Sequence, residues 1–271
     1  GYIDKSGTLV ITDSFLVVNP FHQGLAAVVK RHYTKEDRPN ITDVPGPYVY
    51  IDKTGKEAFN TEFSNADDFS DSFASVFTKD GIDCYIDLKG NLIQTEYDIV
   101  NATPFIDGFA SVRLENGKYA IIDKNFKMLF SEEYNDFKIT NGGYAVARKG
   151  AKFGVLDVKG NVVIDFQYDY LSGYEDQLFI FRKGDRQGYI DINNSLVLSG
   201  YSFSKLDKFE NGFAIAAEKG ANYGVINKSG EFVIPPEFKQ IYSFGEGLYR
   251  CVTLEDTETF YNTSGEEIIS H

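Results

Sequence analysis

The sequence predicts an all-β fold made of tandem repeats about 35 residues long. Three observations predict it. One six-residue motif recurs eight times along the 271 residues, and the apolar content is rich in β-forming aromatics, with 23 Phe and 18 Tyr beside one Met. In addition, 25 glycines are spread along the chain, which suits frequent tight turns and argues against long helices.

The motif first occurs as Tyr2-Ile3-Asp4-Lys5-Ser6-Gly7. It recurs at residues 50–55, 85–90, 121–126, 155–160, 189–194, 225–230 and 260–265. An aromatic residue follows seven or eight positions after the motif in every copy that continues far enough: Phe15, Phe63, Tyr97, Tyr134, Tyr168, Tyr201 and Phe238. This constant phase indicates that each copy belongs to the same structural unit.

The strands of one unit are clearest in the copy that follows residue 212. Period-two alternation predicts strands over residues 213–217, 223–227 and 232–234, with turns at 219–222 and 227–230. Pro235 and Pro236 are expected to end the third strand, because proline cannot donate a ladder hydrogen bond. The extended segment 238–244 leads into the next unit and is a candidate fourth strand.

The order Gly224-Val225-Ile226-Asn227-Lys228-Ser229-Gly230, followed by Val233-Ile234-Pro235, Phe238, Phe244 and Gly247, resembles the bacterial WG-repeat family. The resemblance covers essentially the whole chain apart from an insert after the first copy. The signature Trp-Gly pair is degenerate: Phe153-Gly154 and Tyr223-Gly224 keep both types, Gln187-Gly188 keeps the glycine, and Tyr119-Ala120 keeps the aromatic. The resemblance implies a β-rich repeat scaffold without an assigned reaction.

Residues 1–271 are expected to form a single repeat array with a loop insertion at about residues 31–47. Two arrangements fit: an open, β-solenoid-like superhelical stack and a seven- or eight-bladed β-propeller. Closure usually shows as complementary ends, whereas residues 2–10 and 260–269 contain the same two strands. This favours the open stack.

The repeated Asp-x-x-Gly turns suggest calcium, but each turn supplies one reliable carboxylate and calcium takes six to eight oxygens. We expect instead that Asp or Asn caps its own turn, with Gly or Asn194 in the left-handed backbone position. No metal or cofactor is predicted.

Most of the repeated aromatic residues are expected to form the core between neighbouring units. A tyrosine can expose its hydroxyl to solvent at the edge of a core. Four tyrosines share one repeat position: Tyr2, Tyr50, Tyr85 and Tyr189. They are the candidates for an exposed row of rings that stacks on sugars.

Signs of catalysis are sparse. The histidines His22, His32 and His271 belong to no catalytic motif, and Cys84 and Cys251 have no metal-ligand spacing. A net charge of −13 argues against nucleic acid or an anionic membrane as partner, and no apolar run is long enough to span a bilayer. We therefore expect a protein that is not an enzyme.

The insert is the main irregularity, and insertions in repeat proteins often lie on the binding face. Its candidate binding residues are Arg31, His32, Tyr33, Lys35 and Arg38, a basic cluster in an acidic chain. A mobile loop without function is the alternative.

The sequence thus predicts a binding or scaffold module for a protein or peptide, with carbohydrate binding through the tyrosine row as the alternative. The compartment stays open, with a cell-envelope or secreted location favoured over the cytoplasm.

Overall fold

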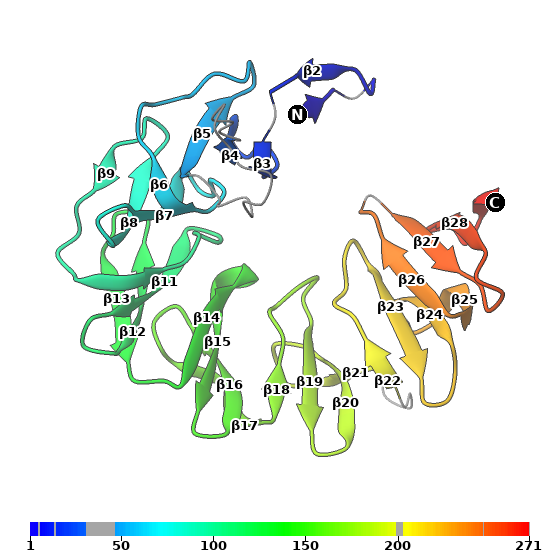
Figure 1. The fold of residues 1–271 in the computed structure, drawn as a ribbon. Helices are drawn as coiled ribbons and strands as arrows, with labels where there is room; N and C mark the ends of the chain where they lie inside the picture. Colours follow the sequence, from blue (N-terminus) through cyan, green and yellow to red (C-terminus); the bar gives the residue numbers. More distant parts are fainter. Residues whose placement is uncertain (5, 14, 31–46, 199–202, 246, 271) are drawn as a thin grey trace, which may run out of the picture. The chain divides into compact units, whose positions relative to one another are not determined.

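The computed structural model describes residues 1–4, 6–13, 15–30, 47–198, 203–245 and 247–270. These residues are almost entirely β, and the one helical element among them is the short 3-10 turn η1 (Asn141–Gly143). The chain divides into two compact units, Gly1–Glu133 and Tyr134–His271 (Figure 1). Each unit is a series of antiparallel sheets, so the predicted all-β repeat fold is confirmed.

The described part of the first unit begins with a two-stranded sheet and continues with a seven-stranded and a four-stranded sheet. The two-stranded sheet contains β1 (Tyr2–Ile3) and β2 (Leu9–Ile11). The seven-stranded sheet contains β3 (Phe15–Val18), β4 (Leu25–Lys30), β5 (Tyr48–Asp52), β6 (Phe63–Ala66), β7 (Phe73–Thr78), β8 (Asp83–Asp87) and β9 (Leu92–Ile93). The four-stranded sheet contains β10 (Ile99–Ala102), β11 (Phe109–Leu114), β12 (Tyr119–Asp123) and β13 (Met128–Glu132).

Over its described residues the second unit forms four four-stranded sheets. The first contains β14 (Asp136–Thr140), β15 (Tyr144–Lys149), β16 (Lys152–Asp157) and β17 (Val162–Tyr168). The second contains β18 (Tyr170–Leu171), β19 (Phe179–Lys183), β20 (Arg186–Ile190) and β21 (Leu196–Val197). The third contains β22 (Phe203–Leu206), β23 (Phe213–Glu218), β24 (Tyr223–Asn227) and β25 (Phe232–Phe238), and the last contains β26 (Gln240–Ser243), β27 (Leu248–Val252), β28 (Glu258–Asn262) and β29 (Glu267–Ser270).

Strands pair in chain order, so a complete module is a four-stranded meander. The candidate fourth strand is confirmed: β26 is the first strand of the sheet that follows. The prediction that Pro235 and Pro236 end a strand is wrong, because β25 continues through both to Phe238. This strand lies at the sheet edge and its register against β24 shifts between Ile234 and Phe238, so the prolines occupy an irregular stretch.

The motif turn joins the third and fourth strands of each module. In the second copy, Asp52 Oδ1 accepts the backbone N–H groups of Thr54 at 2.8 Å and Lys56 at 3.2 Å. Equivalent backbone bonds are accepted in the other copies by Asp4, Asp87, Asp123, Asp157, Asp191, Asn227 and Asn262. Gly55 has φ 86°, and Asn194 takes the same region at 62°. The predicted self-capping turn is confirmed.

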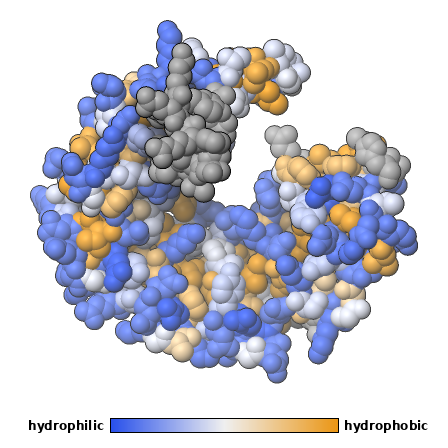
Figure 2. Space-filling view, in the orientation of Figure 1, coloured by the Kyte–Doolittle hydropathy of each residue, from blue (hydrophilic) through white to orange (hydrophobic). Residues whose placement is uncertain are grey.

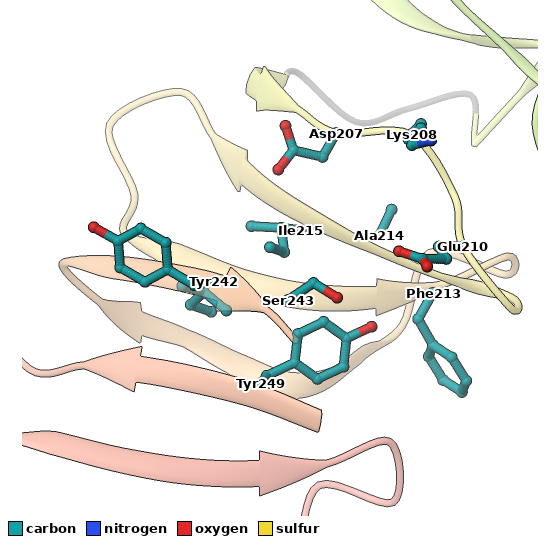
Figure 3. Close-up of a pocket in the computed structure, with 10 residues that line it drawn as sticks. Asp207, Lys208, Glu210, Phe213, Ala214, Ile215, Tyr242, Ser243 and Tyr249 are labelled. Carbon is teal, nitrogen blue, oxygen red and sulfur yellow. The ribbon is translucent and has the colours of Figure 1, made fainter. Parts of the chain in front are cut away.

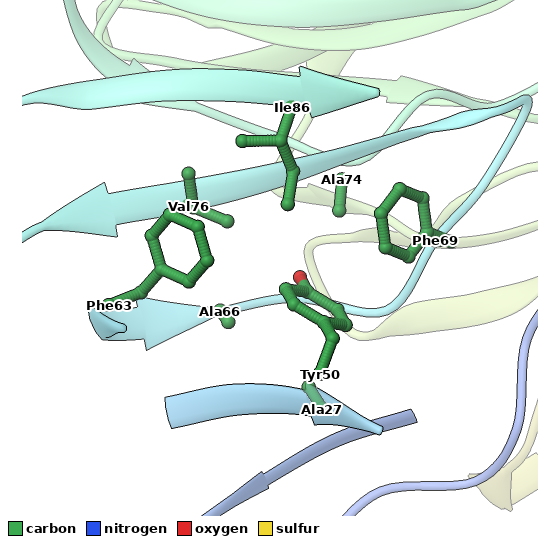
Figure 4. Packing of buried hydrophobic residues seen from close by; sticks show 8 residues of the cluster. All are labelled: Ala27, Tyr50, Phe63, Ala66, Phe69, Ala74, Val76 and Ile86. Carbon is green, nitrogen blue, oxygen red and sulfur yellow. The ribbon is translucent and has the colours of Figure 1, made fainter. Parts of the chain in front are cut away.

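The core consists of apolar clusters, each shared by two successive modules within one unit. One cluster surrounds Tyr50, whose ring lies between small residues of β4, β6 and β7 and the ring of Phe69 (Figure 4). Of the phased aromatics, Phe63, Tyr168 and Phe238 are buried, and Tyr201 lies outside the described residues. The expectation that repeated aromatics form the core between modules is confirmed for these three.

Candidate functional site

The shared tyrosine position is buried. Tyr50, Tyr85 and Tyr189 are each 0% exposed, and Tyr2 is half-buried. The prediction of an exposed tyrosine row is therefore wrong at these three positions, and the physical reason is a hydrogen bond. Each hydroxyl donates to a backbone carbonyl of the following module, at 2.5 Å for Asp67, 2.7 Å for Thr103 and 2.7 Å for Asp207.

Tyr2 makes the same kind of bond, to the carbonyl of Asn19 at 2.8 Å. A phenol whose hydroxyl is satisfied can be buried at little cost. Burial raises the pKa of Tyr50, Tyr85 and Tyr189 above the ordinary value, so all three stay neutral. These residues join modules and offer no binding surface.

The other predicted site, Arg31, His32, Tyr33, Lys35 and Arg38, lies outside the described residues. The insert therefore stays a prediction.

A large residue faces a small one at the junctions between modules. Tyr50, Tyr85 and Tyr189 share core clusters with Ala74, Ala110 and Ala214, the equivalent small residues of the modules that follow. Two junctions reverse this order. Val155 shares a cluster with Phe179, and Val225 shares a cluster with Tyr249, so the ring comes from the later module.

A cleft of about 410 Å³ lies at the second reversed junction. Its lining comes from the start of one module and the start of the next: Asp207, Lys208, Glu210, Phe213, Ala214, Ile215, Ile241, Tyr242, Ser243 and Tyr249. In Figure 3, Tyr249 and Ser243 face the strand that carries Ala214 and Ile215, whereas the ring of Phe213 points away. The cleft thus has an apolar floor from β23 and β26 and a phenol on one wall.

Carboxylates dominate the charge of this cleft. Asp207 and Glu210 line it, and neither forms an ion pair with another described residue. The ammonium group of Lys208 is 3.6 Å from a carboxylate oxygen of Glu175. Burial, and then the charge of Glu210, raise the pKa of Tyr249. The cleft therefore suits a cationic group.

An aromatic ring stands at the rim. Tyr242 is 41% exposed, and its hydroxyl donates to Gln240 Oε1 at 2.6 Å. The guanidinium carbon of Arg250 is 4.5 Å from the ring centroid, and Arg250 Nη1 is 3.5 Å from Glu258 Oε1. Arg250 thus packs against the ring of Tyr242, which remains partly exposed to solvent.

The sequence does contain an indication of this cleft, in the residue types at two repeat positions rather than in the alternation of apolar and polar residues. Five modules place Ala where the last module has Tyr249, and four copies of the motif have Tyr where a later copy has Val225. Only a comparison of residue size at both positions would have marked the junction. Among the described residues, no group of three or more His, Cys, Asp or Glu side chains is arranged to hold a metal ion.

Two general surface properties complete the description. Figure 2 shows one face of the molecule, where hydrophilic residues predominate and hydrophobic atoms form scattered patches. In the part of the chain that the structure describes, no helix has the length and apolar character needed to cross a bilayer.

Comparison with known proteins finds one family model, described as WG containing repeat. It matches residues 1–31, 50–81, 85–119, 153–186 and 223–250, more than half of the chain. A search of the curated proteins finds no match.

Solved structures with similar folds share little sequence. A crystal structure of the eukaryotic initiation factor is 12% identical with a TM-score of 0.57, and the match covers 96% of this chain and 78% of that chain. The computationally designed Ika8 protein is 12% identical with a TM-score of 0.52, over 96% of this chain and 87% of that chain. At this identity the likeness concerns the fold alone.

Proposed function

The chain belongs to the WG-containing repeat family, and on this premise we propose that it is a non-enzymatic binding module for a basic segment of a partner protein or peptide. The proposed site is the cleft between β23 and the strands β26 and β27. The observation that carries the proposal is the pair of carboxylates, Asp207 and Glu210, which line an aromatic-walled cleft without an ion-pair partner among the described residues.

The chemistry of the cleft matches a lysine or arginine side chain. The apolar stem of such a side chain packs along Ile215 and Ile241, while its charged head reaches the carboxylates. Tyr242 adds a partly exposed ring at the rim, against which the apolar stem of such a side chain can pack. The net charge of −13 attracts a basic segment over a longer range.

A peptide is favoured over a carbohydrate. The carbohydrate alternative depended on an exposed row at Tyr50, Tyr85 and Tyr189, and all three are buried. Tandem repeats in general present an extended surface across successive modules, which suits an extended chain as ligand.

The test is fluorescence anisotropy with three labelled ten-residue Gly/Ser peptides that carry two Arg, two Gln or two Glu residues at the same positions. We expect the Arg peptide to bind, and its affinity to fall as ionic strength rises. The double variant Asp207→Asn with Glu210→Gln should weaken this binding at least tenfold. The matched control removes two exposed carboxylates outside the cleft, Asp165→Asn with Glu255→Gln, and should leave binding unchanged.

Two results would overturn the proposal. One is equal binding of the Gln or Glu peptide. The other is an unchanged affinity for the Arg peptide when both cleft carboxylates are neutral while the fold, followed by circular dichroism, is intact.

A further inference from the structure

We propose a second site of opposite charge at the other reversed junction: a cleft that binds a carboxylate carried on a small aromatic or apolar group. It lies between β17 and the strands β19 to β21 and has a volume of about 160 Å³. Its cationic residues are Lys183 and Arg186, and no acidic residue lines it. This cleft is therefore a locally positive region in a chain whose net charge is −13.

The two cationic residues occupy directly paired positions on neighbouring strands. Lys183 on β19 is the cross-strand partner of Arg186 on β20, so both side chains project from the same face of the sheet. Like charges at directly opposite positions destabilise a strand pair. Lys183 Nζ donates to Gln167 Oε1 at 2.6 Å, and Arg186 forms no ion pair with another described residue. An anion between the two groups would relieve their repulsion.

The preceding sheet shows how the same arrangement is neutralised within the fold. There Lys149 faces Lys152, and Lys152 Nζ is 2.5 Å from Asp169 Oδ1. Asp169 also accepts the backbone N–H of Gly184 at 2.7 Å. The pair on β15 and β16 thus includes a lysine that is ion-paired with a carboxylate, whereas neither Lys183 nor Arg186 forms an ion pair with another described residue.

The remaining walls suit an apolar or aromatic body. Phe181 and Ile190 are buried in the floor, and the ring of Tyr168 forms a side wall with Lys183 Nζ 5.7 Å from its centroid. Gly188 lies opposite Phe181, and a Cβ atom at this glycine would stand 3.2 Å from Phe181 Cε1. The glycine therefore lets the Phe181 ring lie close to the strand.

Asn194 contributes a neutral donor. It occupies the turn position that is glycine in most copies, at φ 62°, and its Oδ1 accepts the hydroxyl of Tyr168 at 2.5 Å. With the carbonyl oxygen engaged, the amide nitrogen has its two N–H groups to offer. Together with the guanidinium and ammonium groups, this amide completes a set of donors along one cleft. A carboxylate fits that set, because guanidinium binds carboxylate with two parallel hydrogen bonds.

The experiment uses ¹⁹F NMR of 4-fluorobenzoate with the whole protein. We expect the fluorine signal to shift and broaden on titration, and the affinity to fall at least tenfold in Arg186→Gln and in Lys183→Gln. Lys149→Gln changes the equivalent like-charged pair of the preceding sheet and should leave the affinity unchanged. The thermal midpoint of ligand-free Arg186→Gln should equal or exceed that of the wild type, because the substitution relieves repulsion.

Three outcomes would overturn the inference. They are no binding of 4-fluorobenzoate, equal binding of the neutral 4-fluorobenzamide, and binding of 4-fluorophenyl phosphate in place of the benzoate. Because the test involves neither Asp207 nor Glu210, its failure is distinguishable from failure of the basic-peptide site.

Discussion

Tyr50 keeps one polar atom in the core, its hydroxyl, which donates to the carbonyl of Asp67 at 2.5 Å. Tyr50→Phe removes that donor, keeps the ring, and leaves a carbonyl of the next module without its bond. We expect a loss of about 1–2 kcal/mol in the free energy of unfolding, the usual cost of one buried hydrogen bond with an unsatisfied partner. Urea unfolding measures it. Tyr170→Phe, on a ring that is 45% exposed, is the control and should change stability little.

The motif turns predict how stability responds to acid. The hydroxyls of Ser6 and Thr54, and then nearby backbone N–H groups, lower the pKa of Asp4 and Asp52. The pKa of each carboxyl is lower in the folded than in the unfolded chain. Its contribution is therefore fully present above the unfolded value of about 3.9 and is lost as pH falls through the lowered folded pKa.

Asparagine holds the same turn without a titrating group, as Asn227 does when its Oδ1 accepts Ser229 and Glu231 N–H at 3.0 Å each. The double variant Asp4→Asn with Asp52→Asn should therefore lose less stability than the wild type between pH 5 and pH 2. Urea midpoints at several pH values in this range measure the slope. A control substitution, Asp165→Asn, changes an exposed carboxylate in a strand. Parallel slopes for the wild type and the turn variant would contradict the expectation.

At the scale of elements, packing between modules depends on the summed size of two facing residues. At one reversed junction, Val155 of β16 shares a core cluster with Phe179 of β19, which is fully buried. Phe179→Ala should cost about 3–5 kcal/mol, since it removes a ring and leaves a cavity. Val155→Phe alone should cost about 1–3 kcal/mol through overpacking.

We expect the combined variant to lose less stability than the sum of the two single losses. In this variant the ring comes from the earlier module, as it does at Tyr50 and Ala74. A double-mutant cycle by urea unfolding gives the coupling energy. Additive losses would mean that the junction is fixed by residues other than this pair.

The alternation of apolar and polar residues predicted the inner strands of a module but not the end of the strand that contains the prolines. Residues 213–217 and 223–227 were predicted as strands, and the structure has strands Phe213–Glu218 and Tyr223–Asn227. The continuation of β25 through Pro235 was not predictable from the proline rule, because the rule concerns strands that need hydrogen bonds on both edges. Whether a strand lies at an edge depends on the sheet order, which sequence periodicity does not contain.

At the scale of the molecule, the phase of the motif predicted the series of meanders, because one interface recurs at each step. The repeat phase did not predict that the shared tyrosine position is buried, since a shared repeat position does not show whether its side chain faces solvent or the core. The two clefts were not predicted either. They depend on residues in neighbouring modules, such as Val225 with Tyr249, whose separation in sequence hides that they meet.

The division into two compact units leads to a prediction about the second unit alone. The four sheets formed by its described residues satisfy the minimum of about three repeats that a solenoid needs for stability, and three core clusters of described residues lie entirely within 134–271. A fragment of residues 134–271 should therefore unfold cooperatively in urea and bind the same Arg peptide as the whole chain. A fragment that begins at Tyr170 loses Val146, Val155, Ile164 and Tyr168 from one cluster. It should unfold at a lower urea concentration, because the partners of Phe179 and Phe181 are missing and those rings become exposed. Equal midpoints for the two fragments would show that stability is not transmitted between neighbouring modules, contrary to the nearest-neighbour coupling of a repeat array.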